Sequence, residues 1–199
     1  MTSTARTAPR TLARCAQTAI GVAAVADVFR ATALRDHRLH PSNPSLESGE
    51  VSRVFVNLMT LAVVLFLVWL AKSRTNAQLL SPRSPVPTRG WTVGTWFVPV
   101  VNLFAPRRTV LDIGRASSPS WEERRDTLVV NLWWAAWITH GLILGASTAM
   151  ASTSLALLVV AETLMIAAAV LLGLVIERIT ALQSAALAGP GVTAPLMQV

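Results

Sequence analysis

The run from Val51 to Ala71, V-S-R-V-F-V-N-L-M-T-L-A-V-V-L-F-L-V-W-L-A, most constrains what this chain can fold into. Crossing the apolar part of a bilayer takes roughly 20 residues in a helix, and this run is long enough. Lys72 and Arg74 follow it directly. The chain is 53% hydrophobic and only 14% charged, with a positive mean hydropathy. These values predict an integral membrane protein rather than a soluble domain.

Apolar runs of similar length recur along the chain. We predict membrane helices at residues 12–34, 51–72, 127–150 and 155–178. The short link 151–154 would make the last two antiparallel neighbours. Residues 1–11 and 181–199 are expected to be disordered, which leaves a single membrane domain over residues 12–180. A cleaved signal peptide is the rival interpretation of the first run, with Arg6, Arg10 and Arg14 as its basic start and Ala24 to Ala26 as its cleavage site.

The segment from Trp91 to Ala105 is apolar but too short to cross a bilayer as a helix. Pro99 removes a backbone donor in its middle, Pro106 closes it, and Asn102 adds an amide that needs partners. We therefore predict a re-entrant or interfacial segment that returns to the side it left. The fold class is then an all-α integral membrane protein, a four-transmembrane-helix bundle plus one short re-entrant or interfacial helical segment.

Counting basic residues orients the chain, because cytoplasmic loops of membrane proteins are rich in Lys and Arg. With both termini cytoplasmic and the short segment returning, 13 of the 17 basic residues face the cytoplasm, and only Arg30, Arg35, Arg38 and Arg53 lie outside. A complete crossing by that segment would split the same residues 7 against 10. The expected location is the cytoplasmic membrane. After Pro106, charged and apolar residues at helical spacing predict a helix on the membrane surface.

Ionisable residues inside a membrane span are costly unless they are paired or face water. His140 and Glu162 lie equally far from the centre of the link 151–154, so we expect them at one depth on adjacent helices. Counting residues from the outer ends of the first two helices places Asp27 and Asn57 at the same depth in the membrane. We predict an intramembrane polar cluster of Asp27, Asn57, His140 and Glu162. Interhelical hydrogen bonding that fixes register and a proton, ligand or weak metal site both remain open for it.

A second set of residues surrounds the short segment. Guanidinium groups suit phosphate oxygens, and tryptophan suits the headgroup boundary. The predicted headgroup or phosphate site comprises Arg74, Asn76, Arg89, Trp91, Trp96, Asn102, Arg107 and Arg108. Trp69, Trp133, Trp134 and Trp137 are expected near the same interface. An ordinary collar of positive residues with an aromatic belt is the alternative.

Composition also excludes several classes of protein. The single cysteine, Cys15, excludes an intrachain disulfide and a cysteine metal cluster. One histidine and two acids at unrelated spacings are a weak metal signal, so no metal and no cofactor are predicted. The net charge of +7 is spread between apolar runs rather than gathered in one tail or face. Anionic membrane lipids are therefore the expected partners, without nucleic acid, and a membrane-protein partner or a second copy of the chain stays open.

Three stretches together resemble one known family. They are Trp69 to Ala77 (W-L-A-K-S-R-T-N-A), Gly90 to Pro106 (G-W-T-V-G-T-W-F-V-P-V-V-N-L-F-A-P) and the tryptophans of Trp133 to Trp137. This combination is similar to the mostly actinomycete family of small membrane proteins known as domain of unknown function 4328. The resemblance covers residues 51–176. It implies a bacterial multi-pass membrane protein and no established activity.

The expected function is a non-enzymatic protein that binds a partner or organises lipid through a basic, tryptophan-rich headgroup site. Two alternatives remain. One is a membrane-embedded enzyme acting on a lipid or isoprenoid phosphate, with Arg74, Arg107 and Arg108 holding the phosphate and Asp112 as acid or base. The other is a small proton-coupled transporter using Asp27, His140 and Glu162. No nucleophile motif supports the enzyme, so no catalytic residue is predicted, and no inverted repeat supports the transporter.

Overall fold

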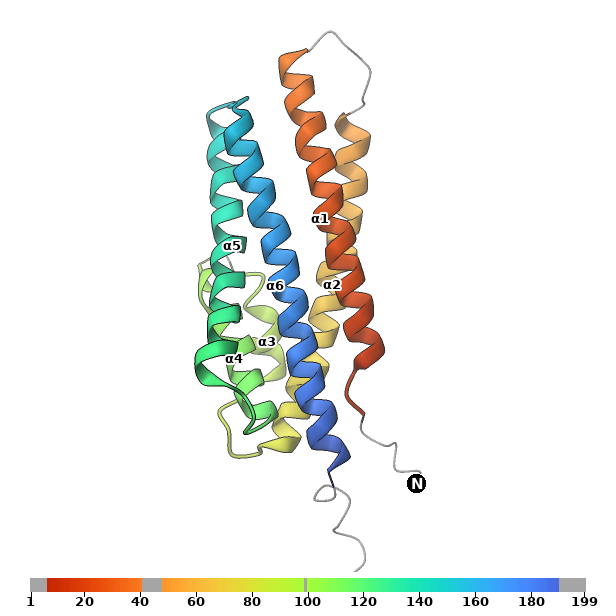
Figure 1. The fold of residues 1–199 in the computed structure, drawn as a ribbon, viewed down its shortest axis with the longest axis vertical. Helices are drawn as coiled ribbons and strands as arrows, with labels where there is room; N and C mark the ends of the chain where they lie inside the picture. The colour runs from red at the N-terminus through yellow and green to blue at the C-terminus, as the bar shows by residue number, and fades with distance from the viewer. Residues whose placement is uncertain (1–6, 41–47, 99, 190–199) are drawn as a thin grey trace, which may run out of the picture. The chain divides into compact units, whose positions relative to one another are not determined.

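The computed structural model describes residues 7–40, 48–98 and 100–189. Within them the chain forms six α-helices and one short 3-10 helix and contains no strand (Figure 1), which confirms the all-α prediction. In chain order they are α1 (Arg10–Leu39), α2 (Ser48–Leu80), α3 (Arg89–Gly94), η1 (Val101–Leu103), α4 (Ala105–Ser117), α5 (Glu123–Ala149) and α6 (Leu155–Ala188).

Four helices, α1, α2, α5 and α6, are long and apolar enough to cross a membrane. They correspond to the four predicted spans. The link between α5 and α6 is as short as expected, and Ala151 turns the chain there with a positive φ of 47°. The backbone N–H of Ser152 donates to the carbonyl of Ser147 at 2.8 Å, which closes the end of α5. This is the fold of a multi-pass membrane protein.

The chain divides into two compact units, and each of the four long helices contributes residues to both. Unit 1 comprises Met1–Arg14, Leu67–Val130 and Leu174–Val199, and unit 2 comprises Cys15–Phe66 and Asn131–Gly173. Each unit is described by itself below.

Unit 2 consists of segments of α1, α2, α5 and α6. Gln17 of α1 donates to the carbonyl of Gly173 on α6 at 2.8 Å. Phe66 of α2 packs against Trp133 of α5, with ring centroids 6.4 Å apart. Small residues of α1, such as Ala16 and Ala23, are fully or almost fully buried, so neighbouring helices can approach α1 closely.

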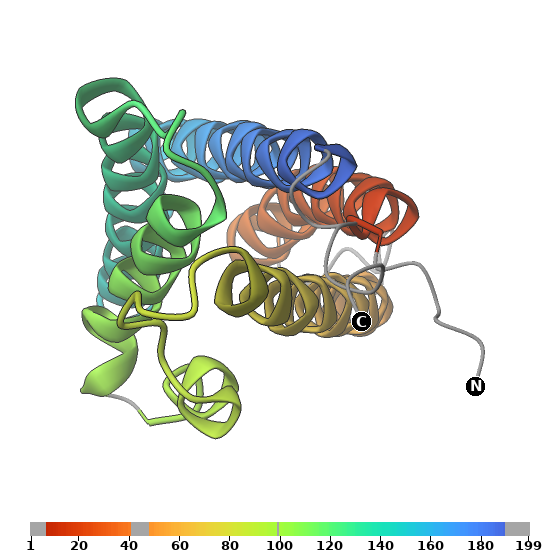
Figure 2. The same ribbon diagram turned by 90° about the horizontal axis from the view of Figure 1, so that it is seen from below.

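Unit 1 holds the short predicted segment together with both of its flanks. Thr88 caps α3, its hydroxyl oxygen accepting from the backbone N–H of Trp91 at 3.3 Å. Helix α3 ends after six residues, and the chain bends before η1 and α4 (Figure 2). The prediction that the backbone of this segment does not run as one unbroken helix is therefore confirmed.

A buried amide also holds unit 1 together. Gln183 of α6 is fully buried, and its Nε2 donates to the carbonyl of Ser73 at 2.8 Å and to Oγ of Ser117 at 2.9 Å. Its Oε1 accepts from Nδ2 of Asn76 at 3.2 Å. Because each of these groups has a partner, the amide joins α2, α4 and α6 without the penalty of an unsatisfied polar group.

Several helices extend beyond their predicted ends. Helix α1 begins at Arg10, α2 continues to Leu80, and α6 continues to Ala188. Residues 181–188 are therefore helical, not disordered, because alanine, leucine and glutamine favour helix and Gly189 follows only after them. Residues 1–6 and 190–199 of the predicted disordered ends lie outside the described residues.

Helix α4 lies where a surface helix is predicted, with Pro106 in its first turn. One face of the helix is buried within unit 1, and its buried apolar residues are Val110, Leu111, Ile113 and Ala116. The helix is thus amphipathic, as expected, but its apolar face packs on protein. It is therefore part of the folded core of unit 1.

Candidate functional site

Three ionisable side chains meet inside unit 2. They are Asp27 on α1, His140 on α5 and Glu162 on α6, with exposed fractions of 0%, 6% and 6%. One ligand atom of each can be chosen so that all three lie within 4.8 Å of one another. We call these three residues the buried triad.

The connection between α5 and α6 places two members of the triad. His140 and Glu162 are 22 positions apart in the sequence, and Ala151, in the tight turn, is midway between them. They therefore lie at matching levels on two antiparallel helices. Arg35 and Arg38, near the end of α1, donate to the carbonyls of Thr153 and Ser152 in the link, at 3.0 and 3.1 Å. These bonds tie α1 to the same turn and bring Asp27 to that level.

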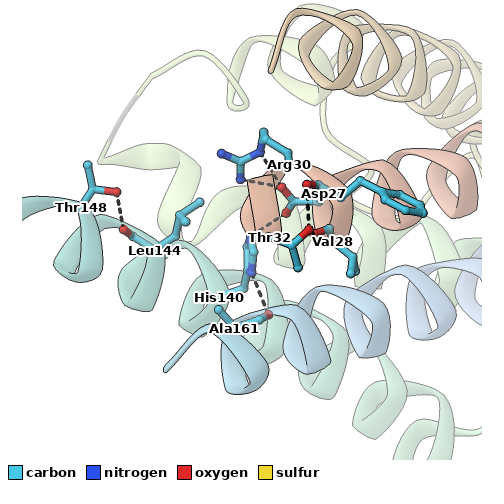
Figure 3. Close-up of polar contacts among 9 residues, drawn as sticks. Asp27, Val28, Arg30, Thr32, His140, Leu144, Thr148 and Ala161 are labelled. Atoms are coloured by element: carbon cyan, nitrogen blue, oxygen red, sulfur yellow. Dashed lines mark hydrogen bonds and ion pairs between the residues drawn. The ribbon is translucent and has the colours of Figure 1, made fainter. Parts of the chain in front are cut away.

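Asp27 lies between two nitrogen-bearing side chains (Figure 3). On one side, Arg30 donates from Nε and Nη2 to Oδ1 of Asp27, at 2.7 and 2.5 Å. On the other side, Nε2 of His140 lies 3.4 Å from Oδ2, which is longer than an ordinary hydrogen bond. Nδ1–H of His140 donates to the carbonyl of Ala161 at 2.9 Å. Because a carbonyl can only accept, this bond assigns the Nδ1 hydrogen.

Two carboxylate oxygens of the triad have no hydrogen-bond partner among the described residues, namely Oδ2 of Asp27 and Oε2 of Glu162. Unsatisfied buried acceptors are rare and costly in folded proteins. Among the described residues, Arg30 is the cation that is hydrogen-bonded to a carboxylate of the triad. The arrangement is short of positive charge, and a proton or a metal cation would supply it.

A cavity of about 160 Å³ in unit 2 reaches the triad at Glu162. Arg30, Arg35 and Arg38 line it from α1, and Ser147 and Ser154 line it from either side of the link. The cavity therefore has three guanidinium groups and one acidic side chain on its wall. It connects the buried triad with a space large enough for several waters.

Asn57 does not belong to this cluster, and that part of the prediction is wrong. Its side chain is exposed. Counting residues gives a depth along the helix axis but not a helix face. Asn57 lies nine positions before the buried Phe66, which places the two roughly 180° apart around α2 at 3.6 residues per turn. Asn57 therefore points away from the packed side of α2.

The predicted headgroup site is only partly assembled. Arg74 is engaged locally, its Nε donating to the carbonyl of Pro87 at 2.7 Å and its Nη2 to Gln78 at 2.8 Å. Asn76 is buried on Gln183. These two residues hold the loop and the core of unit 1, so neither is placed to receive a phosphate.

The remaining members lie on or beside the short segment. Trp91 is 55% exposed, Trp96 and Asn102 are half-buried, and Oδ1 of Asn102 has no hydrogen-bond partner among the described residues. Arg107 is half-buried and Arg108 is exposed, both in the first turn of α4. The side chain of Arg89 lies outside the described part of the structure.

Three of the tryptophans expected in an interfacial belt belong to the protein interior instead. Trp69, Trp133 and Trp134 are 0%, 2% and 6% exposed. Nε1 of Trp69 donates to Oγ1 of Thr180 at 3.1 Å, and the rings of Trp133 and Trp134 meet edge to face at 5.2 Å. The belt prediction is wrong for these three, because each finds a partner within the bundle that composition does not reveal.

Arg30 is the residue of the site that the sequence analysis missed. The sequence places it only among the basic residues on the outer side, yet it is a partner of the triad. Its guanidinium carbon also lies 4.5 Å from the ring centroid of Phe55. Its spacing of three from Asp27 was the available signal, since i,i+3 pairs share a helix face. The buried Gln183 had no comparable signal in the sequence.

The four long apolar helices and the buried triad between three of them define the chain as a multi-pass helical membrane protein. Residues 30–181 match the family model described as Domain of unknown function (DUF4328). The chain belongs to this family, as its tryptophan and proline stretches indicated. No curated protein and no solved structure matches it.

Proposed function

We propose that this protein is a non-enzymatic membrane protein that binds anionic lipid headgroups where the Trp91–Phe104 segment meets the first turn of α4. The single observation that carries the proposal is the exposure of the segment. Its apolar side chains are exposed to an unusual degree, with Phe97, Val100 and Phe104 at 71%, 72% and 71%.

Such exposure is unfavourable in water and favourable in lipid. Burying a Phe-sized side chain contributes about 2 kcal/mol, so Trp91, Phe97 and Phe104 together favour insertion of the segment strongly. The segment lies in a chain that already spans the bilayer, so lipid is the surface available to it. Pro99 and Asn102 prevent it from running as a spanning helix, which favours a shallow position near the headgroups.

Basic residues beside the segment suggest which lipids it binds. Arg107 and Arg108 follow Phe104 after Ala105 and Pro106 and lie in the first turn of α4. Each basic residue close to an anionic membrane surface contributes about 1 kcal/mol of attraction. The net charge of the whole chain, +7, is positive, like the charge of these two arginines. A phosphatidylglycerol-type headgroup is therefore the proposed ligand.

The test compares lipid retention by variants in nanodiscs of mixed phosphatidylglycerol and phosphatidylcholine, measured by native mass spectrometry. Removing both charges with Arg107→Gln and Arg108→Gln should lower the preference for phosphatidylglycerol by about thirtyfold, given about 1 kcal/mol of attraction per residue. The matched control is Arg124→Gln with Arg125→Gln, two exposed arginines in the first turns of α5. An equal loss in the control would mean a general charge effect and would refute the site.

A further inference from the structure

We propose that the buried triad of Asp27, His140 and Glu162 is a binding site for one first-row divalent metal ion, with Zn²⁺ as the representative. The proposal is independent of lipid binding, because its residues lie in unit 2 and none belongs to the headgroup site. It rests on the geometry and hydrogen bonding of the triad.

The orientation of His140 suits a metal ligand. Because Nδ1–H donates to the carbonyl of Ala161, Nε2 is the ring nitrogen that faces Asp27 and that would bind a metal through its lone pair. Histidines that bind metals usually donate their other ring N–H to a carbonyl or carboxylate in this way, which fixes the ring. The ring of Trp137, 6.4 Å away between centroids, packs beside it.

The distance between Nε2 of His140 and Oδ2 of Asp27 also fits a metal site. Nε2 of His140 and Oδ2 of Asp27 are 3.4 Å apart, too far for a normal hydrogen bond. Two ligands bound tetrahedrally to one Zn²⁺, each at about 2.0 to 2.2 Å, are separated by about 3.3 to 3.6 Å. The third ligand atom, on Glu162, lies within 4.8 Å of both, a distance that a side-chain rotation can close.

The unpartnered oxygens point to a missing cation. Oδ2 of Asp27 and Oε2 of Glu162 are the atoms that accept no hydrogen bond from the described residues, while Oδ1 of Asp27 is held by Arg30. Arg30 thus acts as an outer partner that orients the carboxylate and leaves its other oxygen available. A divalent ion would bond to both unpartnered oxygens and to Nε2.

The cavity beside Glu162 offers a route to the site. Because arginines line the cavity, an anion is the alternative occupant to a metal ion. Inorganic phosphate is the probe for an anion. Two of the arginines, Arg35 and Arg38, already donate to carbonyls of the link. A phosphate anion would leave the two unpartnered carboxylate oxygens without a partner and would be repelled by them, whereas a metal cation would bond to both, so we favour the metal over an anion.

The test uses the full chain in detergent, stripped of metal with a chelator, and titrated with Zn²⁺ by calorimetry. We expect one Zn²⁺ per chain and a rise in the melting temperature. Glu162→Gln should weaken binding about tenfold or more, since it replaces an anionic ligand by a neutral amide. The melting temperature of Glu162→Gln without metal should not fall, because Oε2 of Glu162 has no partner to lose.

The matched control removes the other two histidines. His37 and His40 are exposed near the end of α1, and the double variant His37→Ala, His40→Ala should bind Zn²⁺ like the native chain. Three outcomes would overturn the proposal: no Zn²⁺ binding by the native chain, binding lost in the double variant but kept in Glu162→Gln, or a melting temperature raised by inorganic phosphate and not by Zn²⁺.

Discussion

At the scale of single residues, Gly114 in α4 is the position where one methyl group matters most. A Cβ built there would lie 2.3 Å from Cζ3 and 2.5 Å from Cη2 of Trp121. The Trp121 ring is not the end of a flexible chain, and its Nε1 is already buried. Gly114→Ala should therefore destabilise unit 1 by about 1 to 3 kcal/mol, the usual cost of overpacking, measured as a lower melting temperature in detergent.

Gly141 provides the control for this prediction. It also lies within a helix, but a Cβ there would meet nothing within 4 Å. Gly141→Ala should be neutral or stabilising by up to about 1 kcal/mol, because glycine is the poorer helix former. Equal melting temperatures for the two alanine variants would show that Trp121 does not pack on Gly114 as described.

At the scale of elements, the sequence predicted the four long helices and the broken segment, because bilayer thickness and proline chemistry act locally. It predicted three members of the polar cluster by depth along the helix axes. It did not predict which face each residue occupies, so Asn57 was included and Arg30 was left out. Depth follows from counting residues, whereas the face depends on the rotation of each helix against its neighbours.

Helix α4 allows a prediction of pH dependence. Partial burial raises the pKa of Asp112 above its ordinary value, although the nearby Arg108 and Arg115 act to lower it. A carboxyl group with a raised pKa in the folded state binds its proton more tightly there, so its charged form lowers stability at neutral pH. This loss begins to shrink as the pH falls below the folded-state pKa, and it is absent once the pH is below the ordinary, unfolded-state pKa.

Asp112→Asn should therefore raise the melting temperature slightly at neutral pH, by an amount equivalent to about 0.5 kcal/mol or less. The gain should shrink as the pH approaches about 4, near the ordinary carboxyl range. Thermal unfolding across this pH range measures it, with the exposed Glu122→Gln as a control for loss of one negative charge. A less stable Asn variant at neutral pH would show that the ion pairing of Asp112, including Arg115 at 3.9 Å, outweighs its burial.

At the scale of the whole molecule, the remaining prediction is the direction in which the chain is threaded through the membrane. Helix α5 is 27 residues long, about 40 Å, so Ser118 before it and Ser152 after it should lie on opposite sides of the bilayer. Ser84 precedes the short segment and Ser118 follows it. If that segment returns to the side it left, Ser84 and Ser118 share one side, and the excess of basic residues makes that side the cytoplasm.

Single cysteines at Ser84, Ser118 and Ser152, introduced into a Cys15→Ser background because Cys15 is exposed, test this arrangement. A membrane-impermeant maleimide should label Ser152→Cys in intact cells and the other two only after permeabilisation. Ser42, the corresponding position between α1 and α2, lies outside the described residues. Labelling of Ser118→Cys but not Ser84→Cys from outside would mean that the segment crosses the bilayer. The basic first turn of α4 would then lie at the other leaflet from Lys72 and Arg74, and the segment would not have the shallow position that the proposed headgroup site requires.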